Sequence, residues 1–325
     1  MAILYNSNLM IRESRKAQGL TQEQLAEGIC SRETIVKLEK GERKPNWFIF
    51  KEILLRLGLD PEIYSSDVGS EEDVYVLQRM NKCHSLIVAY DFEEAKAEID
   101  SIEAEKNTPA GKMWHSGLGY ELLLRAKASF YSLDVGGRNK YLDPAVSIEY
   151  AMECLQITRP GFDVEKIHDY YLATHEYRLL TSLAIAYEHS DVANALELWR
   201  KLKSNIEKNY AESIRSNANE WYRDLLNNIA IALFRNELYE ECLEVAETGI
   251  ALARATYNML HFCTHLTCKA YCLMKLGRKD EGKHLCKKAI LLAYALDGTA
   301  GQNFVSAKTE YEELFGERLE LGVEW

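Results

Sequence analysis

The sequence predicts an all-α protein, in which a small head of short helices precedes a long array of paired helices. Only five prolines interrupt 325 residues, and runs that alternate Val, Ile or Thr with polar residues, as half-buried strands do, are scarce. Apolar residues instead recur with a period of about 3.6 along the whole chain. A chain of this length is long enough for two or three domains with a sizeable core.

The charge is divided unevenly along the chain. The formal net charge is −11, yet residues 1–64 hold ten Lys and Arg against nine Asp and Glu, so residues 65–325 carry −12. This acidic body excludes a general polyanion binder and confines any nucleic-acid contact to the near-neutral head.

The sequence predicts neither a membrane span nor a disulfide framework. The longest apolar run, AILLAYAL at 289–296, is too short to cross a bilayer, and the opening MAILYNSN lacks the basic flank of a signal peptide. The eight cysteines lie mostly inside helical patterns, which indicates a reducing compartment. We therefore expect a cytoplasmic protein without a membrane partner.

Local signals bound the first two helices of the head. Residues 9–18 place Leu9, Ile11 and Ala17 among basic side chains, which predicts an amphipathic helix that Gly19 ends. Thr21 followed by Gln24 is a capping-box pattern, so a second helix starts there. Gly28 ends this helix after about two turns.

Two further helices complete the head. Ser31 can cap a third helix, whose Ile35 and Leu38 face the second. The apolar run WFIFKEILLRLGL, residues 47–59, supplies a fourth helix and closes a small core. Four side chains of the third helix are left facing outward: Arg32, Glu33, Val36 and Lys37.

This pair of short helices resembles the helix-turn-helix of the Xre, Cro and phage-repressor family. The stretch TQEQLAEGICSRETIVKLEKGERKP carries the resemblance in its TQ opening, its LAE, its S-x-x-T-I core and its L-E-x-G-x-R-x-P tail, and the match covers about residues 8–59. In that geometry the second helix of the pair enters the major groove of DNA while the first crosses the backbone. The alternative is an ordinary helical hairpin that touches nothing.

The resemblance implies DNA-binding roles for eight side chains. Gln22 is implied to meet a phosphate where the second helix begins. Base edges are implied for Arg32, Glu33, Val36 and Lys37, since Arg and Lys can donate to guanine, Glu can accept from cytosine and Val can touch a thymine methyl. Polar residues are commoner in the family at the position of Val36. Lys40, Arg43 and Lys44 are implied to contact phosphates, with a contribution that fades as salt rises.

The resemblance also implies an internal ion pair and a dimer. An Arg of the first helix often pairs in this family with the Glu that ends the third, here Arg15 with Glu39, and a partly buried charge needs such a match. A single head buries too little surface for tight binding, so a homodimer that reads two half-sites about 34 Å apart is expected. The dimer contacts then belong to the rest of the chain.

The head is predicted to span residues 1–64 and the array residues 76–325, with a linker at 65–75 that leads into a connecting helix. DPEIYSSDVGSEED, residues 60–73, has Pro, Gly and a polar cluster but no apolar period. Beyond it the chain repeats. AIALFRNELYEECLEVAETGIALA, which starts at Ala230, aligns without gaps at an offset of 40 with AYCLMKLGRKDEGKHLCKKAILLA, which starts at Ala270.

These units resemble tetratricopeptide repeats, which stack into a right-handed helical array because no single unit can bury both of its apolar stripes. The first helix of each unit is expected to line a concave face, where Asn can bond the backbone of an extended peptide and Arg or Lys can take a carboxylate. The residues expected to bind peptide are Arg178, Thr181, Asp224, Asn227, Asn228, Arg235, Thr264, Thr267 and Lys275. Local bonds are the alternative for Asn227 and Asn228.

The sequence contains no pattern typical of catalysis or of a metal site. A nucleophile elbow, a Walker loop, GxGxxG and HExxH are all absent. His261, His265, Cys268 and Cys272 form one helical stripe whose ends are about 16 Å apart, too far to converge on one metal, so core packing is expected. The alternative is a metal held by two of them with His284 or Cys286. We expect no enzyme activity, no cofactor and no metal.

A head of this kind before a peptide-sized array resembles the cytoplasmic peptide-pheromone receptors of Gram-positive bacteria, the group of the Rgg, PlcR and PrgX proteins. The resemblance covers the domain order and the whole length, and it is specific in the head. It implies a homodimeric quorum-sensing transcription regulator that binds a double-stranded DNA operator and a short imported signalling peptide. Two alternatives stay open, a scaffold whose array holds a protein partner and a repressor that needs no ligand.

Overall fold

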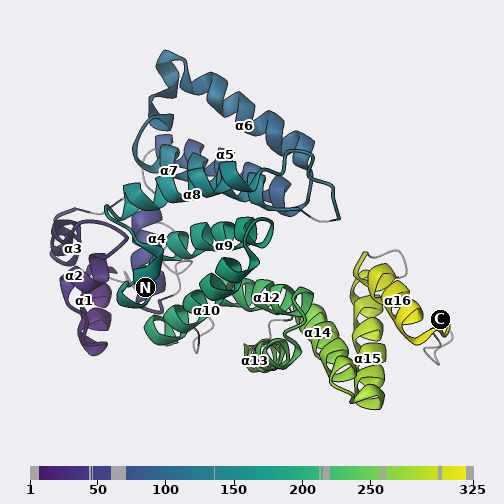
Figure 1. The fold of residues 1–325 in the computed structure, drawn as a ribbon. Coiled ribbons are helices and arrows are strands. Elements are labelled where there is room, and N and C mark those ends of the chain that lie inside the picture. The colour runs from purple at the N-terminus through teal and green to yellow at the C-terminus, as the bar shows by residue number, and fades with distance from the viewer. Residues whose placement is uncertain are drawn as a thin grey trace, which may run out of the picture. The chain divides into compact units, whose positions relative to one another are not determined.

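The protein is all-α in a computed structural model that describes residues 7–43, 45, 47–59, 71–134, 136–211, 214, 220–256, 259, 261–298 and 302–319. Every regular element in these ranges is a helix, as the sequence predicts (Figure 1). The chain divides into two compact units, Met1–Asn219 and Glu220–Trp325. Among the described residues, no helix is long and apolar enough to cross a membrane.

The first unit holds the head and three helix pairs. The head consists of α1 (Ser7–Ala17), α2 (Gln22–Ala26), α3 (Arg32–Glu39) and α4 (Trp47–Arg56). The pairs are α5 (Glu71–Val88) with α6 (Phe92–Lys106), α7 (Gly117–Ser132) with α8 (Pro144–Thr158), and α9 (Thr174–Glu188) with α10 (Val192–Asn209). Two short 3-10 helices, η2 (Pro109–Trp114) and η3 (Val164–Asp169), precede α7 and α9.

The head folds around the local signals that the sequence predicts. The Thr21 Oγ1 atom accepts from the Gln24 backbone N–H at 3.1 Å, and the Gln24 side chain accepts from Thr21 N–H at 2.8 Å, which completes the capping box. Ser31 caps α3 through a bond from Thr34 N–H at 3.3 Å. Leu9 of α1 is half exposed. The core consists of Ile11, Leu25, Ala26, Ile35, Leu38, Phe50, Ile53, Leu54 and Leu57.

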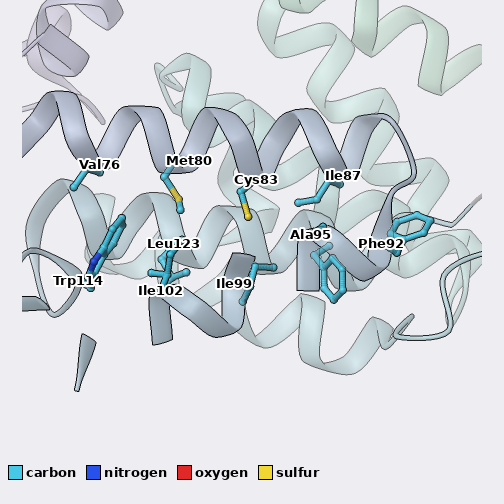
Figure 2. Close-up of a cluster of buried hydrophobic side chains, with 11 residues drawn as sticks. Val76, Met80, Cys83, Ile87, Phe92, Ala95, Ile99, Ile102, Trp114 and Leu123 are labelled. Carbon is cyan, nitrogen blue, oxygen red and sulfur yellow. The ribbon is translucent and has the colours of Figure 1, made fainter. Parts of the chain in front are cut away.

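The first helix pair of the array is joined by one apolar seam. Residues 60–70 of the predicted boundary lie outside the described residues, and α5 begins at Glu71. Figure 2 shows Val76, Met80, Cys83 and Ile87 in one row along α5, at the spacing of a single helix face, above side chains of α6 and α7. The other side chains of this cluster are Phe92, Ala95, Ile99, Ile102, Trp114, Leu123 and Phe130.

The second unit repeats itself at the predicted offset of 40. Its helices are α12 (Glu220–Arg235), α13 (Tyr239–Thr256), α14 (Phe262–Lys275), α15 (Lys279–Asp297) and α16 (Gln302–Phe315). The ends of α12 and α14 are 40 residues apart, and so are the starts of α13 and α15. The left-handed turn residue is Glu237 (φ 61°) in one unit and Gly277 (φ 87°) in the next, so the repeat keeps its backbone even where it lacks the glycine.

Candidate nucleic-acid interface and its contact with the array

The outer face of α3 presents the predicted base-reading side chains. Ile35 and Leu38 are fully buried and anchor the helix to the head core. Arg32 and Glu33 are exposed, while Val36 and Lys37 are half-buried. The four residues therefore form a ridge on the side of α3 opposite the core, as expected for a helix that enters a groove.

Each charge on this ridge has a weak internal partner. Arg32 Nε lies 2.7 Å from Glu23 Oε1, with both side chains 62% exposed. Lys37 Nζ lies 2.7 Å from Glu33 Oε1, and this contact lowers the pKa of Glu33. An exposed pair such as Arg32 with Glu23 contributes about 0.2–1 kcal/mol, so exchanging Glu23 for a DNA base or phosphate costs little.

The remaining phosphate candidates are placed only in part. Lys40 and Arg43 are exposed, and Lys40 Nζ lies 3.6 Å from Glu42 Oε1. Lys44 lies outside the described residues. Their predicted contacts with DNA stay predictions.

The predicted pair of Arg15 with Glu39 is confirmed and holds the ridge to α1. Arg15 Nε donates to Glu39 Oε1 at 2.5 Å and Arg15 Nη2 donates to Glu39 Oε2 at 3.0 Å, a bidentate contact. Burial acts to raise the pKa of Glu39, but hydrogen bonds from Arg15 and Gln22 outweigh burial and lower it. Because the Gln22 Nε2 atom donates to Glu39 Oε2 at 2.9 Å, the side-chain donor that we expect at a phosphate is engaged inside the head.

A hollow of about 210 Å³ beside this pair adds basic residues that the sequence analysis missed. Arg12 and Lys16, one turn apart on α1, line it together with Lys40 and Val36 of α3. Both are exposed, so they extend the positive surface of the ridge onto α1. Their spacing of four residues in an amphipathic helix was the available signal.

Arg56, at the end of α4, joins the head to the array. Its Nη1 atom donates to the backbone oxygens of Gln24 (3.1 Å), Leu25 (3.1 Å) and Glu27 (2.6 Å), so it caps the carboxyl end of α2. On the other side, its Nη2 donates to the backbone oxygen of Tyr171 at 3.0 Å and its Nε to the Tyr210 hydroxyl at 3.2 Å. Arg56 is only 4% exposed, so one buried guanidinium group donates hydrogen bonds to both the head and the array.

Arg159 makes the second link between head and array. Its Nη1 donates to Glu27 Oε1 of the head at 2.9 Å, while its Nε and Nη2 donate to the two carboxylate oxygens of Glu176 at 3.1 and 3.2 Å. Glu176 is fully buried, and burial raises its pKa against the opposing charge of Arg159. A Cβ on Gly28 (φ +71°) would lie 2.3 Å from Glu176 Oε2, so only glycine allows the approach.

A third contact joins α4 to α7 and α9. The Phe48 ring lies 4.7 Å from the Arg125 guanidinium carbon and 5.4 Å from the ring of His175. Glu52 Oε2 is 3.9 Å from His175 Nδ1. Burial, followed by the charge of Arg125, lowers the pKa of His175 well below its usual value, so the ring is neutral. Sequence reasoning missed all three contacts.

The predicted peptide-binding residues fall in both compact units. In the first unit, Arg178 is exposed and Thr181 half-buried on α9. In the second unit, Asp224 Oδ1 lies 2.9 Å from His261 Nε2, and Asn227 is buried with no described partner for its Oδ1. Asn228, Thr264 and Thr267 are half-buried, while Arg235 and Lys275 are exposed. Their role in peptide binding stays a prediction.

The His and Cys stripe of α14 packs largely as predicted. His265, Cys268 and Cys272 are buried, with the His265 ring against Gly249 of α13, and burial lowers the pKa of His265 to about 4. His261 instead turns toward Asp224. Within the described ranges, no group of three or more His, Cys, Asp and Glu side chains is arranged to hold a metal ion.

Comparisons of the sequence find relatives of the head. The helix-turn-helix family matches residues 11–64. An uncharacterised HTH-type transcriptional regulator of Methanothermobacter thermautotrophicus is 48% identical over 50 residues, which are 15% of this chain and 72% of that protein.

Comparisons of the structure extend along nearly the whole chain. PlcR of Bacillus thuringiensis in complex with the peptide PapR7 and DNA aligns with a TM-score of 0.52 and 18% identity, over 96% of this chain and 99% of that chain. The apo form of the competence regulator ComR from Streptococcus vestibularis aligns with a TM-score of 0.47 and 17% identity, over 96% of this chain and 98% of that chain. The likeness to PlcR shows a shared fold, a helix-turn-helix head followed by a helical array.

Proposed function

This chain belongs to the helix-turn-helix family of DNA-binding regulators, and we propose that it is a sequence-specific transcriptional regulator controlled by a short signalling peptide. The observation that carries the proposal is the ridge of Arg32, Glu33, Val36 and Lys37 on α3, held outward by the buried Ile35 and Leu38. A ridge of this kind reads base edges in the major groove. The role is not enzymatic.

DNA binding is proposed to use two kinds of contact. Arg32 and Lys37 leave their weak partners for base edges. Phosphates are contacted by Gln22 through its backbone N–H, since its side chain is engaged by Glu39, and by Lys40, Arg43, Lys44, Arg12 and Lys16. A homodimer that reads two half-sites is the proposed working unit, because one head buries too little surface for tight binding.

Peptide control is proposed to act through the array. One known structure of similar fold, that of PlcR, is of a complex with a peptide and DNA, which supports an equivalent pair of ligands here. Arg178, Thr181, Asp224, Asn227, Asn228, Arg235, Thr264, Thr267 and Lys275 are the proposed contacts. A peptide changes DNA affinity only if it binds two states of the array unequally. Arg56 and Arg159 then carry the change, since they join array and head.

The test compares operator affinity before and after exposure to secreted peptides. An operator selected from random duplexes is titrated with the full chain, with and without the peptide fraction of dense culture medium. A change in affinity of about tenfold, lost in Asn227→Ala/Asn228→Ala but kept in an exposed control such as Asn194→Ala, supports the proposal. Unchanged affinity favours a ligand-independent repressor. A folded protein that co-purifies on the array favours a scaffold.

A further inference from the structure

Arg125, on α7, holds two donors that the described part of the molecule does not use. Its Nε and Nη2 atoms are shielded from solvent and have no hydrogen-bond partner. The two N–H groups lie on the same edge of the planar guanidinium, the edge that can bind both oxygens of one carboxylate. Burial lowers the pKa of Arg125, but an arginine in a protein stays charged.

The helices around Arg125 run in a defined order. α8 is antiparallel to α7, because Ser147 Oγ donates to the backbone oxygen of Ala128 while Cys154 Sγ, two turns later, donates to that of Glu121. The end of α8 meets the start of α9, where Arg159 binds Glu176. α7 and α9 therefore run parallel.

A second arginine lies at the level of Arg125 on α9. The Oγ atoms of Ser129 and Ser182 are 3.0 Å apart and fix the register between the two helices. Arg125 stands one turn before Ser129, and Arg178 stands one turn before Ser182. The charge of Arg178 adds to the effect of burial in lowering the pKa of Arg125, so the two cations repel each other.

Among the residues that the structure describes, no carboxylate forms a hydrogen bond to the Nε or Nη2 atom of Arg125. Glu52 and Glu121 attract Arg125 electrostatically, but neither bonds to its Nε or Nη2. Burial raises the pKa of Glu121, so burial disfavours the charged form of this carboxyl group. His175 is neutral, and its ring nitrogens also lack hydrogen-bond partners. The site is thus positive and polar, with two unpartnered donors on one edge of Arg125, and the Arg178 side chain at the same level is exposed to solvent.

We propose that Arg125 and Arg178 form a carboxylate-binding site between α7 and α9. The inference rests on the proposed peptide control and names the group that the array recognises, a carboxylate at the C-terminus of the peptide or on an acidic side chain. Phe48, whose ring lies 4.7 Å from the Arg125 guanidinium carbon, and Glu52, whose charge attracts Arg125, both belong to α4. An anion bound here repels Glu52, so the ligand acts on the head directly.

The test follows the Nε–H signals of arginine in the full-length protein by nuclear magnetic resonance, with arginine labelled selectively. The probes are N-acetylglycine, which carries a terminal carboxylate, and N-acetylaspartate N-methylamide, which carries only a side-chain carboxylate. Sodium chloride at equal ionic strength is the control. The signal missing in Arg125→Lys should move with saturation for at least one probe, and the tighter probe identifies the source of the carboxylate.

Variants decide whether the site is the one named. Arg125→Gln should weaken the probe about tenfold and the exposed Arg178→Gln about threefold, whereas the exposed loop variant Arg138→Gln should leave binding unchanged. A signal that never saturates, or binding that survives both variants, overturns the inference, as does a marked preference for inorganic phosphate. Because these probes need neither operator nor pheromone, failure here is distinct from failure of the peptide response.

Discussion

Replacing Arg159 by methionine tests the buried ion pair at the contact between head and array. Glu176 is fully buried and Arg159 is 12% exposed, and two donors of Arg159 reach its carboxylate. Removing one partner of a buried pair costs about 3–5 kcal/mol, because the other charge is left unmatched. At about 2–4 °C for each kcal/mol in a unit of this size, we expect the melting temperature of the first unit to fall by about 10 °C.

The loss should depend on pH in a defined direction. Burial already raises the pKa of Glu176, and Arg159→Met removes the charge that opposes this rise. A carboxyl group whose folded pKa is raised binds more protons when folded, so stability falls as pH increases through that pKa. The deficit of the variant should therefore be larger at about pH 8 than at about pH 5, starting from the unfolded value near 4.3.

A second substitution separates this mechanism from a simple loss of packing. In the wild-type protein the Ala173 N–H donates to Glu176 Oε2 at 2.7 Å. In Arg159→Met/Glu176→Gln the side chain at 176 stays neutral, and its amide oxygen can still accept this hydrogen bond. Thermal unfolding followed by circular dichroism should show more than half of the loss recovered. Arg138→Met, in an exposed loop, is the matched control. Two results would show that the loss of stability does not come from an unmatched charge on Glu176. One is a double variant no more stable than the single variant, and the other is a deficit that is equal at both pH values.

Three further predictions concern the head. Gly28→Ala should speed amide exchange in α2 more than Gly19→Ala does, because both glycines have positive φ but only Gly28 meets Glu176; equal effects would show that the close approach is unimportant. The pKa of Glu39 is lowered in the folded head, so its contribution to stability is present above the unfolded pKa and is lost as pH falls through the folded pKa. Glu39→Gln should therefore be less stable near neutrality, and its stability should change less with pH below about pH 4. An acid-unfolding profile unchanged from that of the wild-type protein would contradict this. Lys40→Gln should lower the salt dependence of operator binding by about one counterion without changing the sequence bound, whereas a changed sequence would show that Lys40 reads bases.

The fold of the head follows from short-range signals. Thr21 and Ser31 are side-chain caps within three residues of their partners, and Ile35 and Leu38 follow the helical period, so each element can be read from a few neighbouring residues. The array repeats its pattern at an offset of 40, which the helices of the second unit keep.

The contacts between head and array have no such signal. Arg159 and Glu27 are 132 positions apart and Arg56 and Tyr210 are 154 apart, so no period or motif relates them. In sequence, Arg125 is one basic residue in an amphipathic helix, and only the packing of α7 on α9 and α4 shows that its donors lack partners. Burial and electrostatic balance of this kind depend on tertiary structure.

The most direct test of whether α3 reads DNA is selection of duplexes from a random DNA library by the full-length protein and by its Arg32→Ala variant. We predict that the wild-type protein enriches one sequence with two half-sites about one helical turn apart, and that Arg32→Ala keeps its fold but loses the preference at one position of each half-site, at a cost of about 1–3 kcal/mol. Enrichment of no sequence by the wild-type protein, or the same sequence enriched equally by the variant, would contradict the claim that α3 reads DNA.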